Sequence, residues 1–189
     1  MKKILAIIIT LLGVTSPSWA EVGFVQQVIN GTTFKLISGE TVKMIGVDLN
    51  AAEDNQMNEE RSKAISSFVR GFISGNLVEL EYDAKQKDEE GNLLAYVWFE
   101  YPQELDMETM PLPANYEVSY LKDNEGEGHF LVFLNATMIK SGFAKPTLDG
   151  PNTKHAELFK KNYEEAQQTP SQGELANANV HINISSATR

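Results

Sequence analysis

The turn Asn30-Gly31-Thr32-Thr33 lies between two apolar segments and has the composition of a tight connection between β-strands. A second stretch, Gly91-Asn92-Leu93-Leu94-Ala95-Tyr96, ends a charged turn and begins another apolar segment. Asparagine and glycine favour such turns because they tolerate the backbone conformations that a chain reversal requires. At these two places the chain offers amides and hydroxyls rather than carboxylates or guanidinium groups. The sequence therefore predicts a strand-rich fold in which Thr32 and Asn92 place neutral side chains at two of the turns.

Working outward from these turns, alternating apolar residues predict further strands. Strand-like segments are expected at 22–28, 33–37, 41–47, 77–82 and 93–99. The segment 77–82 alternates apolar and acidic or polar residues, which is typical of a half-buried strand.

Three helices are expected between or after the strands. One follows from apolar residues at spacings of three and four, namely Ile65, Phe68, Val69, Phe72 and Ile73. Two more are expected at 135–141, stopped by Gly142, and at 152–168, which would bury Leu158, Phe159 and Tyr163. Five strands and three helices predict an α+β fold whose sheet closes into an OB-fold-like β-barrel.

The start of the chain has the features of a secretory leader. Met1-Lys2-Lys3 is basic, Ile4 to Val14 is apolar, and Ser18-Trp19-Ala20 offers small residues where a signal peptidase reads. The apolar run is shorter than the ~20 residues that span a bilayer. We therefore predict a signal peptide at 1–20, a mature chain from Glu21, and a secreted or periplasmic location.

The composition of the chain limits the kinds of molecule that it is expected to bind. The chain of 189 residues has no cysteine, so an exported form has to be stable without disulfides. Its net charge is −10, and loss of Lys2 and Lys3 with the leader makes it more negative by two. Such a charge repels phosphate backbones unless basic residues gather on one face. Tight, non-specific binding of nucleic acid is therefore not expected.

Four segments of the chain are informative when they are taken in order. They are Ile29-Asn30-Gly31-Thr32-Thr33-Phe34-Lys35-Leu36, Val42-Lys43-Met44-Ile45-Gly46-Val47-Asp48, Asp88-Glu89-Glu90-Gly91-Asn92-Leu93-Leu94-Ala95-Tyr96 and Leu134-Asn135-Ala136-Thr137-Met138-Ile139-Lys140-Ser141-Gly142-Phe143-Ala144-Lys145. Together they resemble the staphylococcal nuclease (thermonuclease) family. The resemblance covers about 22–168, contains one insertion, and implies a five-stranded OB-fold-like barrel with three helices.

The resemblance also implies calcium-dependent cleavage of DNA and RNA, but this chain departs from the family at the working positions. The two calcium aspartates correspond to Thr32 and Asp48. The glutamate that activates water corresponds to Ala51. The two arginines that stabilise the transition state correspond to Lys43 and Asn92. Ca²⁺ prefers six to eight oxygens, and lysine and asparagine lack the planar charged fork that arginine offers phosphate.

Two of these positions have alternative interpretations. Glu53, two residues beyond Ala51, could return the missing carboxylate if the loop shifted its register. Equally, the acidic residues here could form a solvated loop and the negative first turn of a helix. Asp48 could be a metal ligand or a residue that caps a turn. The acidic residues concerned are Glu53, Asp54, Glu59 and Glu60.

The expected substrate-binding surface is altered as well. The family contacts a terminal phosphate through a lysine–tyrosine pair, where this chain has Glu89-Glu90. It stacks a base on tyrosines after the second helix, where residues 146–149 offer none. Stacking contributes ~1–3 kcal/mol per base. Catalysis and nucleotide binding are thus predicted to be lost together.

The segment 100–128 is an acidic insertion relative to the family. Pro102, Pro111 and Pro113 exclude one long helix, while 116–121 and 130–134 could pair as a hairpin. It could be a docking arm for a basic protein partner, a weak calcium loop, or a solvated hairpin extension. We assign 21–168 to the nuclease-like domain and 169–189 to a polar tail, in which Val180, Ile182 and Ile184 could add an edge strand.

Two hypotheses of function follow. The first is an exported, non-catalytic binding or scaffold module that needs no cofactor. The second is an exported calcium-dependent nuclease that uses Asp48, Lys43 and a displaced Glu53. A groove lined by Thr32, Ala51, Asn92 and Glu89 would favour the first. Clustering of four lysines on one face would favour the second: Lys35, Lys43, Lys140 and Lys145.

Overall fold

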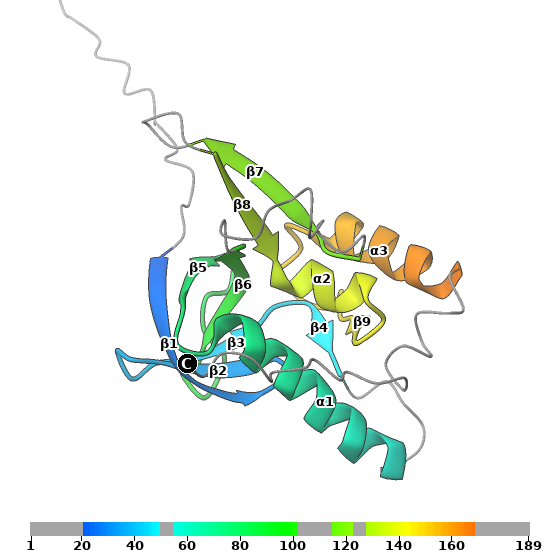
Figure 1. Ribbon diagram of the computed structural model, residues 1–189, viewed down its shortest axis with the longest axis horizontal. Helices are drawn as coiled ribbons and strands as arrows, with labels where there is room; N and C mark the ends of the chain where they lie inside the picture. The colour runs from blue at the N-terminus through cyan, green and yellow to red at the C-terminus, as the bar shows by residue number, and fades with distance from the viewer. Residues whose placement is uncertain (1–20, 50–54, 102–114, 123–127, 169–189) are drawn as a thin grey trace, which may run out of the picture.

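The computed structural model describes residues 21–49, 55–101, 115–122 and 128–168 (Figure 1). In these ranges the chain forms nine strands and three helices. The strands are β1 Glu21–Asn30, β2 Thr33–Leu36, β3 Thr41–Met44, β4 Val47–Asp48, β5 Leu77–Glu81, β6 Leu93–Glu100, β7 Val118–Lys122, β8 Gly128–Phe133 and β9 Lys145–Pro146. The helices are α1 Asn55–Ile73, α2 Leu134–Lys140 and α3 Ala156–Gln168. The predicted leader and the predicted tail lie outside the described residues.

Five of the strands close into a barrel. β1 pairs with β2, β2 with β3, and β5 with both β1 and β6, all antiparallel. A parallel pairing of β3 with β6 closes the circle, so the barrel is mixed. Together with the three helices this is the predicted α+β, OB-fold-like barrel, which is confirmed.

Strand β1 is long enough to pair with two different strands along its length. Its first half pairs with β5, and its second half pairs with β2. The register with β2 shifts between Val25 and Gln27 and again between Val28 and Asn30. Such irregularities bend a strand and increase its twist. The bend lets one strand close the barrel.

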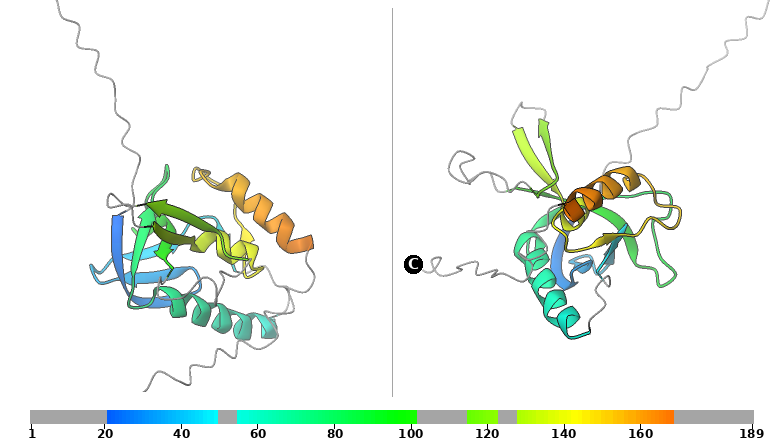
Figure 2. Two further views of the ribbon diagram at one scale, coloured as in Figure 1. Left: turned by 45° about the horizontal axis from the view of Figure 1, so that its top comes forward. Right: turned by 90° about the vertical axis from the view of Figure 1, so that its right-hand side faces the viewer.

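The helices pack on different sides of the barrel (Figure 2). Helix α1 lies along β1, and α2 lies between the barrel and α3. Ile65, Val69 and Ile73 recur every four residues along α1 and are buried, whereas Phe68 and Phe72 are half-buried. The predicted apolar face of α1 is therefore the face that packs on the barrel.

Two polar side chains fasten the helices to the barrel. The buried amide of Asn135 accepts a hydrogen bond from the Val97 backbone N–H and donates to the Ile45 carbonyl, both at 2.8 Å. Arg61 of α1 donates through Nη2 to the Gly142 carbonyl at 2.6 Å. The first contact fixes α2 against β6 and the end of β3, and the second ties α1 to the segment after α2.

The expected elements differ from the observed ones at two places. The predicted strand 41–47 is split into β3 and β4 by a turn at Gly46, whose φ is 72°. A Cβ on Gly46 would lie 2.6 Å from the ring of Phe159, so the turn packs directly on α3. Helix α3 begins four residues later than expected, and it buries Phe159 and Asn162 while Tyr163 is only half-buried.

A hairpin forms where one was predicted: β7, within the insertion, pairs with β8, which follows it, and Leu121 is opposite His129. Figures 1 and 2 show it extending beyond the barrel. Its base packs on the domain, because Tyr116 makes ring contacts with Phe68 and Phe72 of α1. Burial raises the pKa of Tyr116 to about 12.

Glu117, at the base of the same hairpin, also faces the domain. Its carboxylate accepts from Lys140 and from Asn162, both at 3.3 Å. The other acidic residues that led us to consider a docking arm lie outside the described residues. They are Glu104, Asp106, Glu108, Asp123, Glu125 and Glu127.

Candidate functional site

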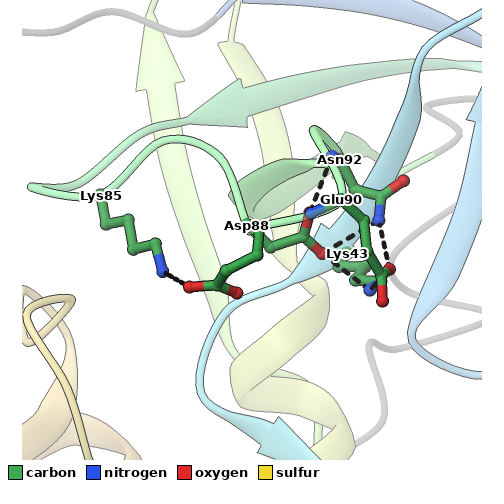
Figure 3. A network of polar contacts seen from close by, with 6 residues as sticks. Lys43, Lys85, Asp88, Glu90 and Asn92 are labelled. Carbon is green, nitrogen blue, oxygen red and sulfur yellow. Dashed lines mark hydrogen bonds and ion pairs between the residues drawn. The ribbon is translucent and has the colours of Figure 1, made fainter.

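Lys43 on β3 is enclosed by carboxylates of the hairpin that precedes β6 (Figure 3). Its Nζ lies 2.7 Å from Asp88 Oδ2 and 2.8 Å from Glu90 Oε2. The parallel pairing of β3 with β6 sets Lys43 opposite Leu94, just beyond the hairpin. The barrel closure itself therefore brings the acidic hairpin to this lysine.

The hairpin is shaped by one aspartate and one glycine. Asp88 Oδ1 accepts from the backbone N–H groups of Asn92 at 2.8 Å and Glu90 at 3.0 Å. This is the way a short carboxylate stabilises a turn. Gly91 has a φ of 85°, which a residue with a Cβ rarely adopts. The sequence Asp88-Glu89-Glu90-Gly91-Asn92 thus fixes a turn that points Asp88 Oδ2 and Glu90 at Lys43.

The amide of Asn92 is engaged by the same carboxylates. Its Nδ2 donates to Asp88 Oδ2 at 2.9 Å and to Glu90 Oε2 at 3.0 Å. Each carboxylate therefore receives donors from both Lys43 and Asn92. We call these four residues, Lys43, Asp88, Glu90 and Asn92, the hairpin network.

The charges in the hairpin network stabilise one another. The hydrogen bonds that Lys43 donates to Asp88 and then to Glu90 raise the pKa of Lys43, and those that Asp88 accepts from Lys43 and Asn92 lower the pKa of Asp88. Both groups remain ionised across the neutral range. A lysine with two carboxylates is a site of net negative charge, so it repels an incoming phosphate group.

Glu89 and Glu90, the two acidic residues that we expected beside a bound phosphate, contact different partners. Glu90 belongs to the hairpin network, whereas Glu89 pairs with Lys85 at 2.5 Å and its side chain is 85% exposed. Ala51 and Glu53 lie outside the described residues, so the predicted groove and the displaced base stay predictions.

Thr32 and Asp48 are brought to the same part of the barrel as Lys43. The Thr32 carbonyl accepts from the Met44 N–H, which places the β1–β2 turn beside β3. A Cβ on Gly31 would lie 2.9 Å from Leu49, so this turn also packs against the segment after Asp48. The fold thus brings the segments of Thr32, Lys43 and Asp48 to one part of the barrel.

The donor set at Thr32 and Asp48 does not fit a calcium ion. The Thr32 hydroxyl is hydrogen-bonded at 3.3 Å to Asn30 within its own turn. Asp48 stands opposite Lys145 in the β4–β9 pair, so a cation of the chain itself is its cross-strand neighbour. Ca²⁺ requires several further oxygens. Within the described residues, no group of three or more histidine, cysteine or acidic side chains is placed to hold a metal ion.

The four lysines whose clustering would favour a nuclease are on four different elements. Lys35 and Lys43 are on β2 and β3, Lys140 is on α2, and Lys145 is on β9. Lys43 and Lys140 both lie against carboxylates, the latter against Glu117 at 3.3 Å.

Sequence reasoning missed Asp88, which organises the hairpin network. It treated 87–92 as a charged turn and considered only Glu89 and Glu90 as obstacles to phosphate. The signal was present, because an aspartate four residues before Asn92 can accept from the backbone of its own turn. What the sequence could not show is that Lys43 lies within reach.

The protein is OB-fold-like, because its barrel has five strands in a mixed sheet and helices pack on different sides of it. Its polar loops gather beside β3, so a site would lie on that side of the barrel. Comparison with known sequences identifies the family. A sequence model described as Staphylococcal nuclease homologue matches residues 41–171. The chain belongs to this family. Among the described residues, no helix is both long and apolar enough to cross a membrane.

Two curated relatives agree with this assignment. One is a thermonuclease from Staphylococcus intermedius, 29% identical over 148 residues, covering 76% of this chain and 70% of the relative. The other is a thermonuclease from Staphylococcus hyicus, 27% identical over 146 residues, covering 75% of this chain and 69% of the relative.

Proposed function

We propose that this protein is an exported, non-catalytic binding or scaffold module of the staphylococcal nuclease family. The observation that supports the proposal is the hairpin network. Lys43 and Asn92 occupy positions where the resemblance places phosphate-binding arginines, and both donate to Asp88 and Glu90. The chain's own carboxylates take the place of an anionic substrate.

The energetic argument has two parts. A phosphodiester that approached Lys43 would have to displace or neutralise two carboxylates, and like charges 4 Å apart repel by roughly 1–4 kcal/mol each near a protein surface. In addition, loss of one transition-state donor lowers a rate by ~10²–10³, and losses of several donors do not simply multiply. Repulsion of substrate and loss of donors act in the same direction.

The alternative is an exported calcium-dependent nuclease with an atypical site. Two observations favour it: both relatives are named thermonuclease, and the fold brings Thr32 and Asp48 beside Lys43. This alternative requires Glu53 or another group to supply the missing base. It also requires Ca²⁺, for which the donor set at Thr32 and Asp48 is a poor fit.

A cleavage assay separates the two functions. The purified mature chain is incubated at high concentration with single-stranded DNA or RNA, in calcium or in chelator. We expect no cutting in either condition. Chelator-sensitive cutting that disappears in Asp48→Ala would refute the non-catalytic proposal. Cutting that survives Asp48→Ala identifies a contaminating enzyme and is removed by further purification before the comparison is repeated.

Export needs its own measurement. The full chain, expressed with its leader in a bacterial host, should be recovered outside the cytoplasm with Glu21 as its first residue, as read by mass spectrometry. Recovery of the intact chain from the cytoplasm would contradict the proposed export.

A further inference from the structure

The outer face of the barrel carries four exposed apolar side chains, Val22, Phe24, Ile37 and Leu77, which we call the β1–β5 patch. Ile37 and Leu77 are 68% and 60% exposed, and Val22 and Phe24 are 58% and 39% exposed. Exposed apolar side chains scattered singly are ordinary, whereas a contiguous group points to an interaction site.

Strand register makes the β1–β5 patch contiguous. Phe24 is directly opposite Leu77 in the β1–β5 pair. On the other side of β1, the Ile37 N–H donates to the Phe24 carbonyl at 2.9 Å. Val22 lies two residues before Phe24 and therefore on the same face of β1. Opposed side chains in a sheet have Cβ atoms about 5 Å apart, so the four form one surface with Phe24 at its centre.

Two charged residues lie on this face at opposite corners of the patch. Glu79 is opposite Val22 in the β1–β5 pair. Lys35 is opposite Gln27 in the β1–β2 pair and lies between two buried residues of β2, so its side chain is turned outward. Phe24 lies between Val22 and Gln27 on the central strand. A line from Glu79 to Lys35 therefore crosses the patch at Phe24.

Neither of these charges is neutralised by a neighbour. Within the part of the chain that the structure describes, Glu79 and Lys35 form no ion pair. The charged residues further along the same outward series do have partners. Glu81 accepts from Trp98 at 2.9 Å, and Lys43 belongs to the hairpin network. The patch is thus an apolar surface with one unpaired acid on one side and one unpaired base on the other.

We propose that the β1–β5 patch is the contact surface between two copies of this chain, related by a two-fold axis at Phe24. In a two-fold contact, a residue i that touches residue j of the second copy is itself repeated as j touching i. An axis that crosses the line from Glu79 to Lys35 at its middle brings Lys35 of each copy to Glu79 of the other. The apolar side chains of the two copies then cover each other between two equivalent ion pairs.

The arrangement of charges favours a second copy over other partners. A uniformly basic partner would be attracted by Glu79 and repelled by Lys35, and a uniformly acidic partner would meet the reverse. A face with one charge of each sign across an apolar centre is complementary to itself. The inference goes beyond the proposed binding role and holds whether or not the protein cleaves nucleic acid.

The dimer is expected to be weak. Four partly exposed side chains cover less than the ~800 Å² per partner that stable complexes bury. The net charge of the chain, which is −10 before loss of the leader, also opposes association. This repulsion is screened beyond ~8 Å at physiological salt. We therefore expect a dissociation constant on the order of 10–100 µM at physiological salt.

The test is sedimentation equilibrium of the mature chain at physiological salt, over concentrations on both sides of this value. Lys35→Glu places two acids at each charged contact, and Glu79→Lys places two bases there. We expect each variant alone to dimerise at least about tenfold more weakly than the wild type. An equimolar mixture of the two should dimerise about as well as the wild type, because a mixed pair has opposite charges at both contacts.

The apolar part of the contact has its own variant. Ile37→Ser/Leu77→Ser should weaken the dimer by about tenfold or more, since two apolar contacts are lost in each copy. The matched control is Ile29→Ser/Leu148→Ser, which removes apolar side chains that are 51% and 40% exposed outside the patch. The control should change the dissociation constant by less than about twofold. Circular dichroism verifies that each variant is folded, and the charge variants supply an independent test if the serine variant is not.

Three results would overturn the proposal. A wild type that stays monomeric throughout would exclude the dimer, and a dimer that appears once Val180, Ile182 and Ile184 are replaced by serine would make the chain's own tail the occupant. A mixture that associates no better than either variant alone would exclude the contact between Lys35 and Glu79. Tighter association of Glu79→Lys alone would show that net charge, which this variant makes less negative, controls association. None of these readouts involves nucleic acid, so failure of this inference is distinguishable from failure of the proposed function.

Discussion

Two carboxylate networks on opposite sides of β6 look alike in composition and differ in surroundings. The hairpin network surrounds Lys43 and is open on one side, since 38% of the Lys43 side chain and 73% of the Glu90 side chain are exposed, although the Asp88 side chain is only 13% exposed. The second network centres on Glu81 of β5, whose side chain is only 15% exposed. The two networks contain similar charged and polar groups, but they differ in how far their side chains are exposed to solvent. We therefore expect them to contribute differently to the stability of the fold.

The network around Glu81 joins β5 to the start of α3. Glu81 accepts from Trp98 Nε1 at 2.9 Å, lies 3.0 Å from His155 Nε2, and pairs with Lys154 at 2.5 Å. The His155 ring also contacts Tyr96 and other aromatic rings. A nearly buried carboxylate that lacks hydrogen-bond donors costs free energy. The hydrogen bonds that Glu81 accepts therefore stabilise the fold. The hairpin network gains little stability but sets the charge of the candidate site.

The largest effect is expected when the Glu81 network is broken. Glu81→Ala leaves the indole N–H of Trp98 and the ring of His155 without their acceptor. We expect the free energy of unfolding to fall by about 2–3 kcal/mol. Urea denaturation of the mature chain measures this. A loss below about 0.5 kcal/mol would show that the network is not a structural anchor.

The pH dependence of Glu81 sharpens the comparison. Burial raises its pKa, but the hydrogen bonds from His155, Lys154 and Trp98 outweigh this and lower the pKa to about 2 from its ordinary 4.5. Because the folded value is depressed, the stabilisation is complete above pH 4.5 and is lost as the pH falls towards 2. The difference in stability between the wild type and Glu81→Gln, about 1 kcal/mol at pH 7 after solvent screening, should shrink over this window. A difference that does not change between pH 7 and pH 3 would contradict this assignment.

Neutralising the hairpin carboxylates should have a smaller effect on stability. Asp88→Asn/Glu90→Gln keeps polar groups in the turn and removes two charges that are opposite Lys43. Thermal denaturation should show a change of at most about 1 kcal/mol, since both substitutions keep hydrogen-bonding groups and the partner, Lys43, is partly open to water. A change as large as that of Glu81→Ala would make the hairpin network a structural anchor, and the contrast between the two networks would fail.

The smallest effect is expected at the neighbouring pair of Lys85 and Glu89. Glu89→Gln removes an exposed ion pair that does not touch Lys43. Stability should change by less than about 0.5 kcal/mol. The variant is also a control for Asp88→Asn/Glu90→Gln, because Glu89 lies in the same turn and its carboxylate pairs with Lys85 instead of Lys43.

The barrel was predictable because its strands are marked by alternating apolar residues and its turns by glycine and asparagine. The order of the strands in the barrel was not predictable from these local patterns. Nor was the split of the strand at Gly46, because the ring of Phe159 that packs on Gly46 belongs to α3, which is distant in sequence. The sequence singled out Lys43, Asn92 and Glu90 one by one, and their roles stay predictions. Their contact with one another depends on the parallel β3–β6 pairing, which no local pattern encodes. Asn162 escaped notice because the carboxylate that its amide contacts, that of Glu117, is distant in sequence.

The central claim is that the chain's own carboxylates occupy the anion position at Lys43. Its most direct test is the dissociation constant of a short single-stranded DNA oligonucleotide for the wild type, Asp88→Asn/Glu90→Gln, and the same double variant with Lys43→Met added. We predict no measurable binding by the wild type, binding by the double variant at low salt, and loss of that binding in the triple variant. Equal binding by the wild type and the double variant, or binding by the double variant that survives Lys43→Met, would contradict the claim.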